Sequence, residues 1–381
     1  MNYVRFGDIA TSRKGKKPTS LTDNPDEIHT IPYVDIKAFE KGQIDNYSDG
    51  TNVVPCEEGD LLLVWDGSRS GLVGRAKRGV ICSTLARIES IQATQPYLYY
   101  FLVSKFQDLN TRQRGSGTPH VDPNVLWNFE LYLPDRIEQE KIVSKIEELF
   151  SDLDKNIASL SDDLKRCESL RSSIIEYSFM RAGGKKIKLS EVTEVITDGD
   201  HQAPPKAATG VPFIVISNIQ NNRVLLSKAS RYVPSSYYEA LKDSRKAKTG
   251  DVLYTVTGSY GIPALVEDNN RFCFQRHIAL LRPNASMIDP RYLLYALQTD
   301  SVYKQATAIA TGTAQLTVPL TGLRKIDIDM IPIKDQQNVV KQVEAKLSEL
   351  DALRSTIQDS IRLARNMRQS ILTKAFKGEL I

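Results

Sequence analysis

Basic and amide side chains gather in loops that also contain glycine and proline, where they could contact nucleic acid. Proteins use Lys and Arg for phosphates, and Arg, Lys, Asn or Gln for base edges. Two such loops, Arg112–His120 and Thr311–Gln315, contain glycines that let a backbone approach closely. The candidates in the first half of the chain are Lys14, Lys16, Lys17, Arg69, Arg75, Arg112, Gln113, Arg114 and His120. The candidates in the second half are His201, Gln202, Asn221, Arg223, Lys246, Ser259, Tyr260, Arg276 and Gln315.

Each of these side chains, taken alone, is also explained as an ordinary surface residue that keeps a protein soluble. The formal net charge of +4 over 381 residues is only weakly basic. This charge permits nucleic-acid binding without requiring it. If DNA is the partner, positive charge must be concentrated locally, or other subunits must supply part of it.

Residue patterns that would indicate catalysis or a bound cofactor are missing from the sequence. The piece Gly67–Gly74 lacks the lysine and the hydroxyl group of a nucleotide-binding loop. Ala203 precedes Pro204-Pro205, so no Asn-Pro-Pro-Tyr-like motif of an amino-methyltransferase is formed. The four histidines and four cysteines show no metal-ligand spacing. We expect no cofactor or metal on this chain, and we expect His277 to end a strand in a structural role.

The composition is that of an ordinary globular protein of two to three domains. Hydrophobic residues make up 41% of the chain and charged residues 25%. No apolar run approaches the length of a membrane span, and Met1 leads into Tyr3–Phe6 without a signal-peptide pattern. Scattered cysteines suit a reducing compartment. We therefore expect a cytoplasmic protein that does not enter a membrane.

Two long stretches, Glu138–Phe179 and Asp335–Phe376, each predict one amphipathic helix without Gly or Pro. A single apolar stripe of this kind would be explained by packing on any core. Two matched stripes favour packing of the helices on each other. We expect both stripes to continue through Leu170 and Met367. The expected core of the helix pair consists of Ile142, Ile146, Leu149, Leu153, Leu160, Leu164, Val343, Leu347, Leu350, Ile357, Ile361 and Ile371.

The segments before the two long stretches repeat one mixed α/β plan. The strand-like pieces Ile31–Val34 and Asp60–Trp65 are followed by a buried helix at Pro96–Leu109 and an alternating piece at Phe129–Pro134. Val211–Ile214 and later pieces repeat this order in the second half. Between the shared glycines, prolines and apolar positions the halves differ widely. One scaffold therefore presents two different surfaces.

The lengths of these segments predict how the chain runs. Each helix of roughly 40 residues is about 60 Å long. A globular unit of about 140 residues spans roughly 35 to 40 Å, which is too little to bring the chain back. We therefore expect an antiparallel helix pair with a pseudo-two-fold internal repeat, and neighbouring chain termini. The expected parts are domains at 1–134 and 182–332, helices at 135–181 and 333–381, and a linker at 181–186.

This architecture resembles the specificity subunit of type I restriction–modification systems. The resemblance covers the whole chain and rests on the duplicated order of domain and helix. Its motifs are Leu133-Pro134 with Glu138-Gln139, Ile331-Pro332 with Asp335-Gln336-Gln337, Leu170–Ile174, Met367–Leu372, and Gly378-Glu379-Leu380. The resemblance implies an α+β fold in which two similar target-recognition domains are separated by two long antiparallel, coiled-coil helices.

The resemblance also implies function and partners. Each domain would read one half of a split site in double-stranded DNA, and the helices would set the spacer and dock two modification subunits. S-adenosylmethionine and ATP would bind to the modification and restriction/translocase subunits, and this chain would not be an enzyme. Cys82–Ala86 departs from Gln275–Ala279 of the second half, so a contact made by Arg276 cannot be copied to the first half.

Two alternatives remain open on the sequence alone. The chain could be an interaction protein whose helical strut separates two protein-binding domains, with no DNA involved. It could also be an enzyme such as a nuclease, although the missing motifs argue against this. Salt-dependent binding to duplex DNA, once a modification subunit is added, distinguishes the first alternative, and incubation with DNA and a divalent metal tests the second.

Overall fold

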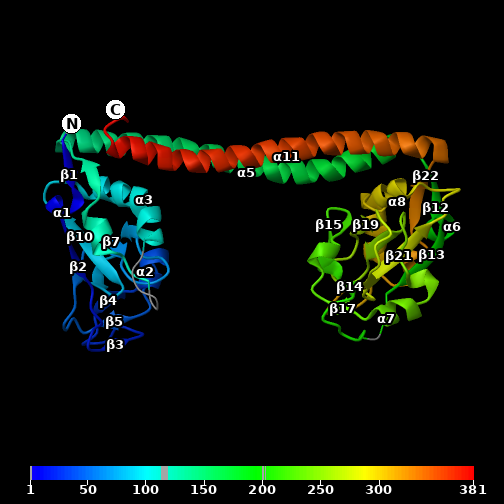
Figure 1. Ribbon diagram of the computed structural model, residues 1–381, viewed down its shortest axis with the longest axis horizontal. Coiled ribbons are helices and arrows are strands. Elements are labelled where there is room, and N and C mark those ends of the chain that lie inside the picture. The colour runs from blue at the N-terminus through cyan, green and yellow to red at the C-terminus, as the bar shows by residue number, and fades with distance from the viewer. Residues whose placement is uncertain (1, 113–118, 200, 202) are drawn as a thin grey trace. The chain divides into compact units, whose positions relative to one another are not determined.

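The computed structural model describes residues 2–112, 119–199, 201 and 203–381, which form two compact units. Unit 1 comprises Met1–Ser161 with Asp359–Ile381, and unit 2 comprises Asp162–Gln358. Each unit holds a mixed α/β domain and part of each long helix, α5 (Arg136–Ala182) and α11 (Ile333–Phe376) (Figure 1). Every helix in the described ranges is too short or too polar to cross a lipid bilayer.

Two β-sheets form the framework of unit 1. Their strands are β2 (Ala10–Lys14), β3 (Leu21–Thr22), β4 (Ile31–Val34), β5 (Tyr47–Ser48), β6 (Pro55–Cys56), β7 (Leu61–Val64), β8 (Val73–Arg75), β9 (Gly79–Ile81) and β10 (Leu85–Ser90). One sheet has the order β2-β10-β7-β8 and the other β3-β5-β4-β9-β6. In β7, Leu61 and Leu63 join one apolar cluster, and Leu62 and Val64 join another. The alternation of side chains along a strand thus places β7 between two cores.

The remaining elements of unit 1 cover these sheets. They are β1 (Tyr3–Arg5), which pairs with β11 (Glu130–Tyr132), and the helices α1 (Phe6–Ile9), α2 (Ile36–Lys41), α3 (Gln95–Thr111) and α4 (Pro123–Trp127). Helix α3 confirms the buried helix predicted at Pro96–Leu109, because Tyr97, Leu98, Phe101 and Leu102 are all buried.

Unit 2 repeats this framework with additions. Its strands are β12 (Lys185–Lys188), β13 (Thr193–Asp198), β14 (Val211–Ile214), β15 (Ile219–Gln220), β16 (Arg223–Val224), β17 (Tyr232–Val233), β18 (Val252–Thr255), β19 (Pro263–Leu265), β20 (Cys273–Phe274), β21 (Ile278–Pro283) and β22 (Asp327–Met330). The order β13-β21-β18-β19 corresponds to β2-β10-β7-β8 of unit 1, and the β15–β16 hairpin extends it. Strands β14 and β20 run parallel, as β4 and β9 do. The predicted internal repeat is therefore confirmed.

The helices of unit 2 differ more from those of unit 1. They are α6 (Leu189–Val192), α7 (Ser235–Ala240), α8 (Pro290–Ala296), α9 (Asp300–Ile309), α10 (Leu320–Leu323) and the 3-10 helices η1 (Ile216–Asn218), η2 (Leu226–Lys228) and η3 (Asp243–Arg245). Two helices, α8 and α9, stand where unit 1 has the single helix α3. Arg181 and Ala182 are the last residues of α5, and Lys185 and Lys186 belong to β12, which pairs with β22. The predicted linker at 181–186 was therefore wrong for Lys185 and Lys186, and only Gly183 and Gly184 lie between the helix and the strand.

A buried glutamine fixes the start of each long helix to its domain. Gln139 Oε1 accepts from the N–H of Thr94 at 2.8 Å, and its Nε2 donates to the carbonyl of Pro134 at 2.9 Å. In unit 2, Gln336 Oε1 accepts from the N–H of Asp289 at 2.8 Å, and its Nε2 donates to the carbonyl of Ile331 at 2.9 Å. Both side chains are almost fully buried. Each unit thus holds a helix start by the same pair of bonds.

A buried phenylalanine fixes the end of the other long helix to the same domain. Phe376 of α11 packs on Tyr97 in unit 1, with ring centroids 5.1 Å apart. Phe179 of α5 packs on Tyr292 in unit 2 at 4.8 Å. Within each unit, the start of one helix therefore lies with the end of the other, which confirms the antiparallel arrangement. Tyr3 Oη also donates to the carbonyl of Lys377 at 2.9 Å, so the termini are neighbours, as predicted.

Two crossed ion pairs join the helices, one in each unit. Arg368 of α11 pairs with Asp154 of α5 in unit 1. Arg171 of α5 lies 3.9 Å from the carboxylate of Asp351 of α11 in unit 2. Because these residues are equivalent in the sequence repeat, one kind of pair is made twice in opposite directions.

Much of the predicted apolar stripe is buried, in part against the domains: Ile142 and Ile146 belong to the apolar cluster of unit 1, and Val343 and Leu347 to that of unit 2. Leu149, Leu160, Leu164 and Ile371 are half-buried. The placement of Leu170 and Met367 on the stripe was wrong, because these side chains are 48% and 47% exposed. An α-helix has 3.6 residues per turn, so the buried face drifts away from a strict three–four spacing. The buried predicted members are Ile142, Ile146, Leu153, Val343, Leu347, Leu350, Ile357 and Ile361.

Candidate nucleic-acid interface

A surface hollow of about 430 Å³ in unit 2 brings together three of the predicted residues, His201, Arg276 and Gln315. The end of β13, the loop after β18, the turn before β21 and the loop that follows Thr311 form its walls. These segments come from distant parts of the chain. The polar side chains that line the hollow are Asp198, His201, Thr257, Arg276, His277, Gln315 and Thr317.

Backbone hydrogen bonds hold these loops in place. The N–H of Val256 donates to the carbonyl of His277 at 2.9 Å, and the N–H of Val318 donates to the carbonyl of Val256 at 2.8 Å. Gly258, with φ of 69°, donates to the carbonyl of Leu316 at 2.9 Å. The positive φ favours glycine at this position, and a Cβ there would lie 2.7 Å from the flexible end of the Gln315 side chain. These hydrogen bonds hold in place the loops that carry the side chains of the hollow.

Both hydrogen-bond donors and acceptors face the hollow. The carboxylate of Asp198 lies 2.9 Å from His201 Nε2, and the guanidinium of Arg245 lies 3.8 Å from the same carboxylate. Arg276 Nε donates to His277 Nε2 at 3.4 Å. Burial, together with the nearby Arg276 charge, lowers the pKa of His277. A neutral His277 can accept this bond, which leaves the exposed Arg276 side chain at the mouth of the site.

The prediction that His277 ends a strand was wrong. The N–H of Ile278 donates to the carbonyl of Gln275 at 3.1 Å and closes a turn, so His277 comes just before β21. Ser259 is exposed on the loop beside Gln315. Tyr260 follows it, stacks on Tyr303 with centroids 5.7 Å apart, and donates to Thr307 at 3.1 Å. These contacts extend the same edge of the domain.

The equivalent region of unit 1 lies at the end of β2 and in the loops at Asp66 and Pro119-His120, and it carries different side chains. The N–H of Gly67 donates to the carbonyl of Pro119 at 2.7 Å, as Gly258 does to Leu316. Lys14 Nζ lies 2.7 Å from Asp66, and Asp66 forms a β-bridge with His120. Two predicted residues, Lys14 and His120, are thus brought together. The two units therefore share the loop contacts, but unit 1 carries Lys14 and Asp66 where unit 2 carries Asp198 and Thr257.

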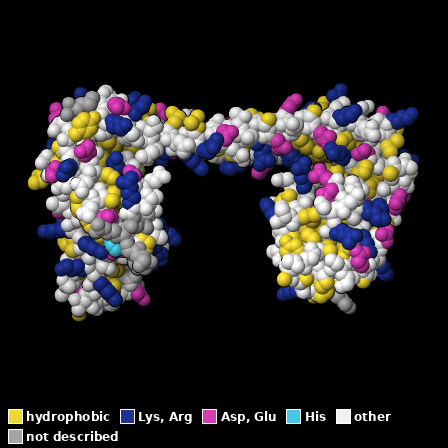
Figure 2. Space-filling model, in the orientation of Figure 1, with side chains coloured by type: hydrophobic (Ala, Val, Ile, Leu, Met, Phe, Trp, Pro, Cys, Tyr) yellow, Lys and Arg dark blue, Asp and Glu magenta, His cyan; other side chains and the backbone are white. Residues whose placement is uncertain are grey.

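The other predicted residues of unit 1 are spread over its surface. Lys16 donates to Asn52 at 3.3 Å, while Lys17 is exposed. Arg69 pairs with Glu40, the guanidinium of Arg75 lies 5.6 Å from the ring centre of Tyr99, and Arg112 caps the end of α3. Gln113, Arg114 and Gln202 lie outside the described residues. On the face shown in Figure 2, Lys and Arg are interspersed with Asp and Glu on each unit.

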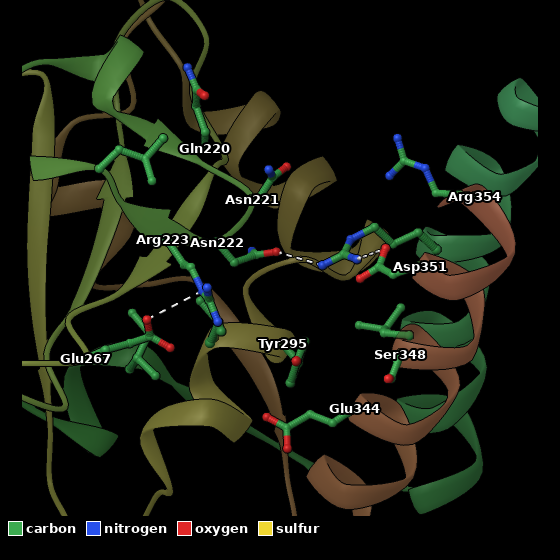
Figure 3. Close-up of a pocket in the computed structure, with 15 residues that line it drawn as sticks. Gln220, Asn221, Asn222, Arg223, Glu267, Tyr295, Glu344, Ser348, Asp351 and Arg354 are labelled. Carbon is green, nitrogen blue, oxygen red and sulfur yellow. Dashed lines mark hydrogen bonds and ion pairs between the residues drawn. The ribbon is translucent and has the colours of Figure 1, made fainter. Parts of the chain in front are cut away.

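Asn221 and Arg223 lie in a separate notch of about 740 Å³ in unit 2, between the β15–β16 hairpin and the long helices (Figure 3). Both Asn221 and Asn222 adopt positive φ, as a tight hairpin turn requires. Arg171 Nη2 donates to Asn222 Oδ1 at 3.0 Å, and Arg223 lies 3.4 Å from Glu267. The hollow and the notch are therefore different surfaces.

Lys246 also lies apart from the hollow. It donates to the carbonyl of Glu239 at 2.9 Å, and its ammonium group lies 5.4 Å from the ring centre of Tyr238. These contacts explain Lys246 as a packing residue.

Reasoning from the sequence missed Asp198 and Thr257, because neither residue type stands out in the chain. Only the register of β13 and the loop contacts place them in the hollow.

The sequence is similar to known proteins over most of its length. A family model described as the type I restriction modification DNA specificity domain matches residues 1–161 and 183–362. The type I restriction enzyme MjaVIII specificity subunit from Methanocaldococcus jannaschii is 23% identical, over 97% of this chain and 91% of the relative. The EcoBI specificity subunit from Escherichia coli is 21% identical, over 92% and 80%.

Solved structures share the fold. A chain from a structural study of complex assembly and conformational transition of the type I R-M system has a TM-score of 0.70 and 21% identity, with coverage of 100% of this chain and 98% of that chain. The HsdS subunit from Thermoanaerobacter tengcongensis has a TM-score of 0.58 and 22% identity, with coverage of 100% and 97%. Both matches include the two domains and both long helices.

Proposed function

Because the chain belongs to the type I restriction modification DNA specificity domain family, we propose that each of its domains reads one half of a bipartite DNA site. The chain is a DNA sequence-specificity subunit of a type I restriction–modification system. Its target-recognition domains span residues 1–134 and 182–332. The helices at 135–181 and 333–381 fix the spacer between the two half-sites.

One observation carries this proposal: the two units build the same edge from equivalent strands and loops but place different side chains on it. In unit 1 this edge presents Lys14, Asp66 and His120, and in unit 2 it presents Asp198, Arg276 and Gln315. Lys, Arg and Gln donate to base edges, and Asp accepts from them. A protein that reads two unlike half-sites needs a repeated frame with different reading groups.

The chemistry of the system belongs to partner subunits in this proposal. Two modification subunits bind S-adenosylmethionine and methylate adenine at N6, and restriction/translocase subunits use ATP. A methyltransferase must extrude its target base from the duplex, so another element has to hold the DNA in register. Two domains tethered in one chain do this well, because the second half-site contact becomes intramolecular.

Single-molecule sequencing of methylated adenines in host DNA tests the proposal directly. We expect one bipartite motif with two different half-sites and an unread spacer of fixed length. The assembled complex should also bind this duplex with affinity that falls steeply as salt rises. Binding that is independent of salt and of DNA sequence would instead favour a protein-binding role for the two domains.

A further inference from the structure

One position in the β-ladder carries opposite charges in the two units. In unit 1, Ala86 pairs with Lys14 on one side and with Leu63 on the other. In unit 2, Ala279 pairs with Asp198 on one side and with Tyr254 on the other. Lys14 and Asp198 are therefore equivalent, and both are the last residue of their strand.

The same register shows what faces each of these groups. Lys14 Nζ lies 2.7 Å from Asp66, which follows β7. The residue equivalent to Asp66 after β18 is Thr257, which lines the hollow together with Asp198. With a neutral hydroxyl in place of Asp66, the neighbours of the Asp198 carboxylate are His201 Nε2, at 2.9 Å, and the guanidinium of Arg245, at 3.8 Å. The hollow thus contains a carboxylate where unit 1 has an ammonium group.

A carboxylate weakens binding to phosphates, so a contact of Asp198 with DNA would serve discrimination between bases. An ionised carboxylate only accepts hydrogen bonds and has about four acceptor positions, so the contact with His201 leaves room for a further donor. In the major groove the donors of DNA are the amino groups of cytosine and adenine. An ammonium group only donates, and it suits the O6 and N7 acceptors of guanine.

We propose that this ladder position selects bases by hydrogen-bond polarity. Asp198 accepts from the exocyclic amino group of a base in the half-site read by unit 2. Lys14 donates to guanine acceptors in the half-site read by unit 1. This inference rests on the proposed function, and it assigns to Asp198, which the sequence did not single out, the role of a specificity determinant.

The test uses the full chain assembled with the modification subunits of its own system, and a duplex library with randomised half-sites. Methylated products are sequenced for the wild type, Asp198→Asn and Lys14→Met. Asparagine keeps the size of aspartate but can donate as well as accept, so we expect the base preference at one position of one half-site to change by about tenfold or more. Lys14→Met should relax one guanine position in the other half-site only.

The controls separate failure of this inference from failure of the proposed function. Asp268→Asn removes the same charge from an exposed loop of unit 2, and it should leave both half-sites unchanged. Thermal unfolding confirms that each variant is folded. An unchanged motif in both folded variants, or equal loss at every position, overturns the inference while the wild-type motif stands. A wild-type complex without a bipartite motif overturns the proposed function itself.

Discussion

In unit 1 the buried amide of Gln139 bonds the N–H of Thr94 and the carbonyl of Pro134, and in unit 2 Gln336 makes the same bonds. The two units are thus alike where the domains meet the long helices. At the edge that we propose to contact DNA they differ, with Lys14 in one and Asp198 in the other. This contrast indicates that the repeat preserves the junction and varies the reading groups. The domains can therefore change their surface without changing their attachment.

The largest loss of stability should follow from removing the buried glutamine that attaches a long helix to its domain in each unit. Gln139→Ala and Gln336→Ala each leave a buried N–H and buried carbonyls without partners, at about 1–3 kcal/mol per group. We expect each substitution to lower the free energy of unfolding of its own unit by about 3 kcal/mol. Urea unfolding combined with hydrogen exchange measures this for each unit.

Gln337 provides the matched control, because it neighbours Gln336 but is exposed. Gln337→Ala should change the free energy of unfolding by less than about 0.5 kcal/mol. Clearly unequal losses for Gln139→Ala and Gln336→Ala would show that the two junctions are equivalent in geometry only.

The crossed ion pairs sharpen the comparison because their surroundings differ. The guanidinium of Arg368 lies 4.7 Å from the ring centre of Phe150, while Arg171 also donates to Asn222 of the hairpin. Both arginines are partly exposed, so Arg368→Ala and Arg171→Ala should each cost only about 1 kcal/mol in unfolding free energy.

Hydrogen exchange distinguishes the two arginine variants. Arg171→Ala should speed exchange in the β15–β16 hairpin, because the side chain that ties the hairpin to the helix is removed. Arg368→Ala should leave the hairpin unaffected. Equal exchange at Asn222 in both variants would show that the hairpin is held by its own turn and not by Arg171.

Much of the fold could be predicted from the sequence because it depends on local and repeated signals. The two long helices lack Gly and Pro and carry regular apolar stripes. The duplicated order of motifs predicts two similar domains. Leu170 and Met367 were misplaced because a three–four spacing and a period of 3.6 diverge over many turns. Lys185 and Lys186 were misplaced because their strand is defined by its distant partner β22.

The candidate site was harder to predict, because it is assembled from segments far apart in the chain. His201, Arg276 and Gln315 were found by residue type, and the structure brings them to one hollow. Asn221 and Arg223 were found in the same way, yet they lie in the notch. Residue type thus identifies groups able to contact DNA. Strand register decides which of them share a surface.

The smallest effect concerns pH and one residue, His277, which has Thr84 as its equivalent in unit 1. The carbonyl of His277 accepts a hydrogen bond from the N–H of Val256, which follows β18. The carbonyl of Thr84 accepts one from the N–H of Trp65, which follows β7. Burial and then the charge of Arg276 lower the pKa of His277 in the folded state. The unfolded chain therefore binds the proton more readily, with a pKa of about 6.5.

The sign of the pH effect follows from that difference. The contribution of His277 to the stability of unit 2 is fully present above pH of about 6.5, and it is lost as the pH falls through the folded pKa. We expect hydrogen exchange in β18 and β21 to accelerate between pH 7 and pH 5, after correction for intrinsic rates, more in the wild type than in His277→Gln. The equivalent strands β7 and β10, which adjoin Thr84, should show no difference between the two proteins. An equal response of both units would mean that the titrating group lies elsewhere, and that the two edges differ in shape without differing in their response to protons.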